Sequence, residues 1–123
     1  MEHHSNFIPW QQLAAKKNAV LKLIPLTADF TLDLNSITQL VTPKTKLVAL
    51  THISNVLGTI NPIKDITRLI KKINPKTLVL VDAAQSVAHL PLDVTNFNID
   101  FLAFSGHKMY GPTGVGVLWV KQN

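Results

Sequence analysis

The 123-residue sequence contains no cysteine and a single arginine, Arg68. Without cysteine it can form neither a disulfide bond nor a cysteine-ligated metal site, and nothing argues for an oxidising compartment. Its net charge of +5 comes from scattered lysines with only short pairs such as Lys71 and Lys72. Nucleic-acid-binding surfaces usually carry clustered basic residues that include arginines. No apolar run approaches the roughly 20 residues of a membrane span, and the opening MEHHSNFIPW lacks a signal-peptide pattern. We therefore expect a cytoplasmic protein that binds neither nucleic acid nor membrane.

Hydrophobic residues are plentiful, at 46% of the chain against 15% charged residues. This composition is typical of a globular protein, and the length suffices for one small domain. We see no linker, repeat or low-complexity tract, so residues 1–123 are predicted to belong to one domain. The apolar content is high for so short a chain, which favours contact with a partner surface.

Helical and strand patterns alternate along the chain. Helices are expected at 11–18, which the preceding Ile-Pro-Trp can open, at 33–41 and at 61–74. The last has Asn61 as its cap, Pro62 at its first position and apolar residues at 63, 66, 69, 70 and 73. Strands are expected at 19–26, ending at Pro25, and at 45–53 and 76–84, with two more flanking the Ser-Gly-His-Lys turn after Asp100. This alternation predicts an α/β fold with a mostly parallel sheet and helices on both faces.

Polar groups follow three of the expected strands. They are His52 to Asn55, Asp82 to Gln85, and Ser105 to Lys108. In parallel sheets functional groups collect beyond the carboxyl ends of the strands, where the loops meet. We therefore expect these three segments to form one site.

Lys108 and Asp82 are the most informative pair. Taken singly, Asp82 can be a capping aspartate and Lys108 a lysine that extends from a strand end to solvent. Together, a nucleophilic lysine and an acidic residue on neighbouring strand ends match what pyridoxal phosphate requires, an amine to trap its aldehyde and a carboxylate to keep its pyridine nitrogen protonated. Hydroxyl and imidazole donors for its phosphate, and amide donors for its phenolic oxygen, are available in Ser105, His107, Gln85 and Asn55.

Several segments then carry a family resemblance. THISNVLGT (51–59), VDAAQSVAHLPLDV (81–94), DFLAFSGHKMYGPTGVGVLWVK (100–121) and the opening MEHHSNFIPWQ resemble class V aminotransferase-fold enzymes, and most closely Suf-type cysteine desulfurases, with selenocysteine lyases adjacent. The related Nif/Isc-type desulfurases tend to have Asn-Asn-Glu in place of SNVLG and Ser-Ala-His-Lys in place of Ser-Gly-His-Lys. The match runs in order over essentially the whole chain. It implies a fragment of the large pyridoxal-phosphate-binding domain of a fold-type I enzyme.

The resemblance also implies roles for seven residues. Lys108 would hold pyridoxal phosphate as a Schiff base and move protons at the substrate Cα, and Asp82 would pair with the pyridine nitrogen. Gln85 would donate to the phenolic oxygen, with Asn55 near that oxygen and the substrate carboxylate. Ser105 and His107 would bind phosphate. His3 would stack on the ring and act in acid-base steps, unless it is an ordinary terminal histidine.

Other histidines and glycines receive plainer interpretations. His4, His52 and His89 are expected to be structural, because no spacing suggests a metal site. The GPTGVG loop lacks the Lys-Ser/Thr of a phosphate-binding P-loop and precedes a strand, so it is expected to be a tight turn.

Family subunits are considerably longer, so the resemblance implies missing parts. An upstream glycine-threonine turn, a downstream arginine for the substrate carboxylate, the sulfur-accepting cysteine and the small domain have no counterpart here. Two functions are open: part of a homodimeric cysteine desulfurase that passes sulfur from L-cysteine to a Suf acceptor protein for iron-sulfur cluster assembly, or an inactive or regulatory fragment. Selenocysteine lyase, or another class V activity, is the alternative among enzymes.

Overall fold

The computed structural model describes residues 1–122 and is built around one sheet. Its strands are β1 (Leu47–Thr51), β2 (Leu78–Asp82), β3 (Phe101–Ser105) and β4 (Gly116–Val120), in the order β1-β2-β3-β4. The first three run parallel, and β4 returns antiparallel to β3. The three parallel strands therefore end at the same edge.

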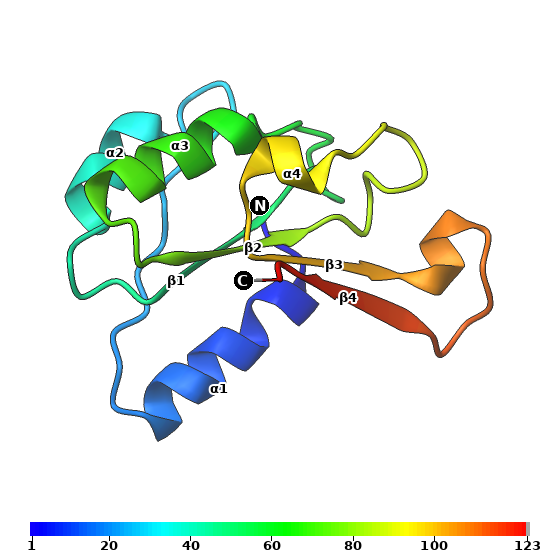
Figure 1. The fold of residues 1–123 in the computed structure, drawn as a ribbon, viewed down its shortest axis with the longest axis horizontal. Helices are drawn as coiled ribbons and strands as arrows, with labels where there is room; N and C mark the ends of the chain where they lie inside the picture. Colours follow the sequence, from blue (N-terminus) through cyan, green and yellow to red (C-terminus); the bar gives the residue numbers. More distant parts are fainter. Residues whose placement is uncertain (123) are drawn as a thin grey trace.

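Helices lie on both sides of this sheet (Figure 1). The helices α2 (Leu34–Leu40), α3 (Ile63–Ile73) and α4 (Val94–Phe97) cover one face, and α1 (Ile8–Lys16) lies on the opposite side. There are also two short 3-10 helices: η1 (His4–Asn6) precedes α1, and η2 (Gly106–Met109) follows β3. The predicted α/β class, with a mostly parallel sheet and helices on both faces, is confirmed.

The core lies between the sheet and α3. Ile63, Ile66 and Ile70 form one stripe of α3 and are fully buried against a sheet face that includes Val79 and Val81. Polar residues on the other side of α3 remain exposed, so the helix is amphipathic with the period that the sequence shows. Burying three isoleucines and two valines supplies the main apolar contribution to the fold.

The strand predicted at 19–26 is absent. The segment is extended coil whose one β-bridge pairs Leu26 with Leu32, and its alternating residues are left in solvent, with Val20 82% and Leu23 64% exposed. A strand is stabilised by a partner for its backbone groups, and Pro25 removes one donor here. Alternation in the sequence indicated an amphipathic segment, but no neighbouring strand in the described chain pairs with it.

Other predicted boundaries need smaller corrections. The first helix opens at Ile8, in the Ile-Pro-Trp that the sequence offered as its opening, and it ends at Lys16 rather than residue 18. Asn61 does not cap α3, whose N-cap position is Pro62, without a side-chain cap bond. The Asn61 amide instead donates to the Thr51 carbonyl, 2.8 Å away, and so ties the start of α3 to the end of β1.

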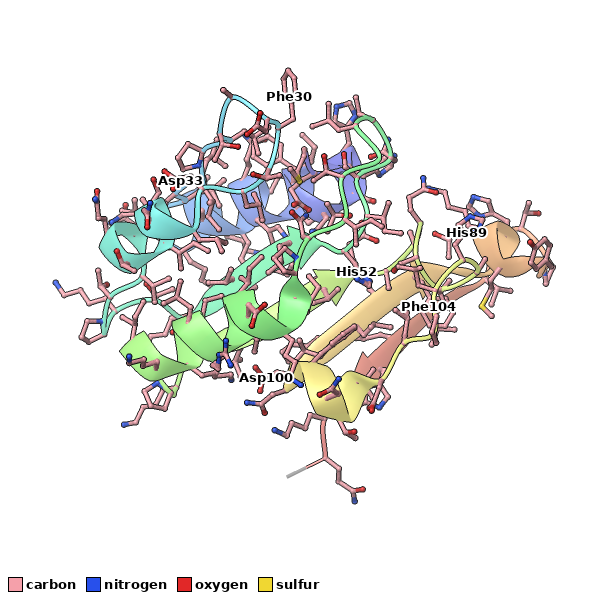
Figure 2. All side chains as sticks on the ribbon, turned by 90° about the horizontal axis from the view of Figure 1, so that it is seen from above. Phe30, Asp33, His52, His89, Asp100 and Phe104 are labelled. Atoms are coloured by element: carbon pink, nitrogen blue, oxygen red, sulfur yellow. The ribbon has the colours of Figure 1, made fainter. Side chains whose placement is uncertain are left out.

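A half-buried ion pair that includes Asp100 lies at the opposite end of the sheet (Figure 2). One carboxylate oxygen of Asp100 accepts hydrogen bonds from the Lys71 ammonium and from the Val79 backbone N–H, both at 2.7 Å. The pair links α3, the beginning of β2 and the beginning of β3. None of the helices within residues 1–122 is both long and apolar enough to cross a bilayer.

Candidate functional site

The carboxyl ends of β1, β2 and β3 surround a pocket of about 280 Å³. All seven residues that the sequence singled out contribute to its lining: His3, Asn55, Asp82, Gln85, Ser105, His107 and Lys108. They come from four separate segments spanning more than a hundred positions of the sequence. The expectation that the strand-end segments lie together is met, as parallel strand geometry requires.

Asn55 is placed by a tight loop after β1. Ile53 and Ile60 form an antiparallel bridge, and the Gly58 N–H donates to the Ser54 carbonyl at 3.0 Å. Gly58 has φ +71°, a left-handed conformation that glycine adopts without a steric penalty. The loop therefore turns back within a few residues and presents the exposed Asn55 at the pocket.

Asp82 ends β2 and remains partly buried. Its Oδ1 accepts a hydrogen bond from the Ala84 N–H at 2.9 Å, which opens the turn that carries Gln85. Asp82 thus does cap a turn, as the simpler interpretation held, and it also lines the pocket. One carboxylate can fill both roles because it has two oxygens and several acceptor positions.

Lys108 and His107 lie on η2, directly after β3. The register pairs Ser105 with Gly116, and the Gly106 N–H donates to the Val115 carbonyl at 2.8 Å, so the chain reverses tightly here. A Cβ on Gly106 would lie 3.2 Å from the Val115 carbonyl oxygen and 3.3 Å from that of Pro112. The glycine-rich loop is the tight turn that the sequence predicted, and it holds η2 against the sheet end.

His3 reaches the pocket from the N-terminal segment. Its Nδ1 accepts a hydrogen bond from the Ser5 N–H at 3.2 Å and lies 2.7 Å from the Ser5 hydroxyl. A ring nitrogen that accepts from a backbone N–H carries no proton, so the neutral ring holds its proton on Nε2. The imidazole is therefore oriented by its own helix cap.

Glu2, which sequence reasoning missed, carries the clearest electrostatic perturbation near the site. Burial raises the pKa of the Glu2 carboxyl above its ordinary value, and the neighbouring Asp82 carboxylate raises it further. Hydrogen bonds from Thr51 and Asn6 oppose that shift. The N-terminal segment and the end of β2 thus bring two acidic groups close together.

Four further residues line the pocket: Ser5, Thr51, Ile53 and Ala84. Ile53 and Ala84 lie inside the segments expected to form the site, whereas Ser5 and Thr51 lie outside them. Thr51 is the last residue of β1 and directly precedes the segment His52 to Asn55. Knowing where β1 ends would therefore have added Thr51 to the predicted site. His4 and His52 do not line the pocket. His89 lines a more open hollow of about 380 Å³ that shares Asn55 and Gln85 with it. In residues 1–122 no group of three or more potential ligands could hold a metal ion.

This fold and pocket define a class of protein. The family Aminotransferase class-V matches residues 1–123, and the chain belongs to that family. A curated cysteine desulfurase from Shigella sonnei (strain Ss046) is 52% identical over 122 residues, which cover 99% of this chain and 30% of the relative.

Solved structures agree with this assignment. The crystal structure of the cysteine desulfurase CsdA (S-sulfonic acid) from Escherichia coli superimposes with a TM-score of 0.88 at 41% identity, covering 98% of this chain and 30% of that one. The apo structure of a cysteine desulfurase from Thermococcus onnurineus NA1 gives a TM-score of 0.90 at 41% identity, with the same coverage. The chain spans about a third of the length of these relatives.

The pocket's donor set fits pyridoxal phosphate, on which the family depends. A carboxylate suits a protonated ring nitrogen, an amine suits an aldehyde, and hydroxyl, imidazole and amide groups suit phosphate and phenolate oxygens. The volume of about 280 Å³ is near the lower limit for small-molecule sites, roughly 300 Å³. Each polar group of the cofactor has a chemically matched side chain.

Proposed function

We propose that residues 1–123 form part of the pyridoxal-phosphate-binding large domain of a cysteine desulfurase of the Suf type. The supporting observation is the convergence of His3, Asp82, Gln85, His107 and Lys108, with Asn55 and Ser105, on one pocket. The identity of 52% to a curated cysteine desulfurase adds to it. The sequence motifs SNVLG and Ser-Gly-His-Lys favour the Suf branch over the Nif/Isc branch.

Each residue has a role in this proposal. When bound, pyridoxal phosphate supplies an electron sink for bond cleavage in the substrate amino acid. Lys108 would hold the cofactor and would move protons at the substrate Cα. Asp82 keeps a proton on the pyridine nitrogen through its charge. His3 lines the same pocket and would stack on the ring and exchange protons through Nε2.

The remaining groups orient rather than react. Gln85 donates a hydrogen bond to the phenolic oxygen, and Asn55 lies beside it and the substrate carboxylate. Ser105 and His107 donate to the phosphate. These contacts would hold both ends of the cofactor in place relative to Lys108, and such positioning lowers the barrier to reaction.

The overall reaction converts L-cysteine and an acceptor thiol into L-alanine and a persulfide. The carbon–sulfur bond of the substrate breaks, and a sulfur–sulfur bond forms at the acceptor. Because the chain has no cysteine, the accepting thiol must lie outside residues 1–123. In this proposal the sulfur then passes to a Suf acceptor protein for iron-sulfur cluster assembly, and the complete enzyme is a cytoplasmic homodimer.

That absence of cysteine also favours a second candidate function. A chain that keeps the cofactor pocket without a sulfur acceptor can act as an inactive or regulatory fragment that binds the cofactor alone. Selenocysteine lyase, or another class V activity, is the enzyme alternative, since it shares the cofactor residues. The neighbouring coding sequence separates the two: an upstream frame encoding a glycine-threonine turn and a downstream frame encoding a cysteine loop would favour the enzyme.

A spectroscopic titration tests cofactor binding. Adding pyridoxal phosphate to the purified chain should produce a saturable visible absorption band, and Lys108→Ala should abolish it because the covalent attachment is lost. Lys72→Ala is the matched control, since Lys72 is an exposed lysine of α3, and it should titrate like the wild type. Equal bands in all three proteins would reject the proposed site.

A further inference from the structure

Glu2 joins the N-terminal segment to the end of β1 through both of its carboxylate oxygens. Oε1 accepts the Thr51 backbone N–H at 2.9 Å, and Oε2 accepts the Asn6 side-chain amide at 2.6 Å. The other end of that amide, Oδ1, accepts the Trp10 indole N–H at 3.0 Å. A continuous chain of hydrogen bonds thus runs from β1 through η1 to α1.

The strand edge explains why a carboxylate is needed at this position. β1 is an outer strand, and Thr51 is buried, so its N–H would be left without a partner on the open edge. An unpaired buried N–H costs free energy comparable to a lost hydrogen bond, and bonds to a charged acceptor are the stronger kind. Glu2 satisfies this donor from a segment that is 49 positions away.

The same contacts determine where His3 lies. His3 stands between Glu2 and η1, whose Asn6 is buried and held by Glu2. The His3 ring is itself exposed, and within residues 1–122 it forms hydrogen bonds with Ser5, two residues away. Local bonds orient the ring within the segment, but they cannot place the segment over the pocket. That placement depends on contacts with the sheet and the loop after β1. Glu2 accepts the Thr51 N–H, the Met1 carbonyl accepts the Ser54 hydroxyl at 3.0 Å, and the Met1 sulfur accepts the Asn61 amide at 3.1 Å.

We propose that Glu2 is a positioning residue that docks the N-terminal segment onto β1 and thereby holds His3 over the pocket. The proposal deepens the function proposed above, and it rests on it for the identity of the pocket's ligand. Glu2 itself does not line the pocket, so it acts through His3 rather than on the ligand.

Histidine footprinting tests this with built-in references. Diethyl pyrocarbonate modifies accessible neutral imidazoles, and mass spectrometry locates each modified ring. Pyridoxal phosphate should shield His3 and His107, which both line the pocket, but not His4, which does not. In Glu2→Ala the ligand should still shield His107, whereas the shielding of His3 should fall by about tenfold, as expected when two hydrogen bonds to a carboxylate are lost.

A paired substitution separates docking from a general loss of stability. Glu2→Gln places a second amide against the Asn6 amide, so two donors face each other. Adding Asn6→Asp restores an acceptor for Gln at position 2 and still accepts from Trp10. The double variant should recover His3 shielding.

Asp33→Ala provides the matched control for the loss of a structural carboxylate. Asp33 caps α2 through Asn35 and Ser36, at the other end of the molecule from His89 (Figure 2). This variant should keep wild-type shielding of His3.

The outcomes distinguish the two proposals. Full His3 shielding in Glu2→Ala, or equal losses in Asp33→Ala, would overturn the positioning role. Absence of His107 shielding in the wild type would instead reject the proposed ligand. In that case exchange of the Thr51 amide proton still tests the docking: it should be slow in the wild type and fast in Glu2→Ala, and unchanged exchange would overturn it.

Discussion

At the residue scale, His52 is a buried ring on the sheet face opposite the pocket. It is 6% exposed, its ring meets the edge of Phe97 at a centroid distance of 5.4 Å, and no described residue bonds its Nδ1. Burial lowers the pKa of His52 below its ordinary value. Protonation would add a charge and a donor without an acceptor, so the folded state prefers the neutral ring. His52 is structural, as the sequence led us to expect.

The lowered pKa of His52 makes stability depend on pH. The unfolded chain binds this proton more readily, so the stabilisation is complete above about pH 6.5 and is lost as the pH falls through the lower folded value. We expect the urea midpoint to fall between pH 7 and 5, and to fall less in His52→Phe. The raised pKa of Glu2 acts in the opposite direction in both proteins, so the difference between them isolates His52. Equal slopes would contradict this assignment.

Residue roles differed in how far the sequence revealed them. Asp82, Gln85 and Lys108 could be predicted because each follows an apolar strand, and parallel strands end at one edge. Glu2 could not be predicted, since its partner Thr51 lies 49 positions away and no local pattern marks the contact. Such contacts depend on how segments pack in three dimensions, which periodicity does not report.

At the scale of elements, η2 depends on the glycine at its start. Gly106 is buried, and the Val115 and Pro112 carbonyl oxygens leave little room at its Cβ position. The chain from Gly111 to Val115 folds back over it, and the Gly111 N–H donates to the Gly106 carbonyl at 2.9 Å. Lys108 is therefore placed by backbone packing.

Gly106→Ala should disturb this element. The added methyl group must push two backbone carbonyls aside, so we expect a loss of about 1–3 kcal/mol of folding free energy. The visible band with pyridoxal phosphate should weaken as Lys108 shifts. Gly116→Ala is the control, because its new methyl group would lie 3.6 Å from the nearest carbonyl oxygen, an ordinary contact. If both variants unfold and titrate alike, backbone packing does not place Lys108.

Elements were predictable where pattern and packing agree. The apolar stripe of α3 follows the helical period because one face of the helix is buried, whereas β1 and β2 were predictable as short continuous apolar runs. The segment 19–26 also alternates between apolar and polar residues. Alternation indicates which residues share a face, but it does not indicate whether a neighbouring strand is present to pair with the segment. The short α4 was missed because four residues are too few to show a helical period.

At the scale of the whole molecule, one sheet face is incompletely covered. Leu78, Leu118 and Val120 lie on the face opposite the buried Val79 and Val81, and they are 43%, 58% and 52% exposed. The site's Asp82 and Ser105 lie on this same face. Contiguous exposed apolar area of this kind favours association.

The isolated chain should therefore self-associate. Sedimentation velocity should give a molar mass that rises with protein concentration, and Leu118→Glu should lower it by placing a charge on the apolar face. Val56→Glu is the control, since Val56 is 75% exposed in the loop after β1. A monomer at every concentration, or equal effects of the two substitutions, would show that this face does not drive association.

The central claim, that strand ends gather around Lys108 to hold pyridoxal phosphate, is tested most directly by chemical mapping. The chain is mixed with one equivalent of the cofactor, reduced with borohydride and digested, and each of its eleven lysines is examined for the added mass. The account predicts the adduct on Lys108, and its loss without transfer to another lysine in Asp82→Ala, because the carboxylate holds the ring nitrogen. An adduct spread evenly over the exposed lysines would contradict it.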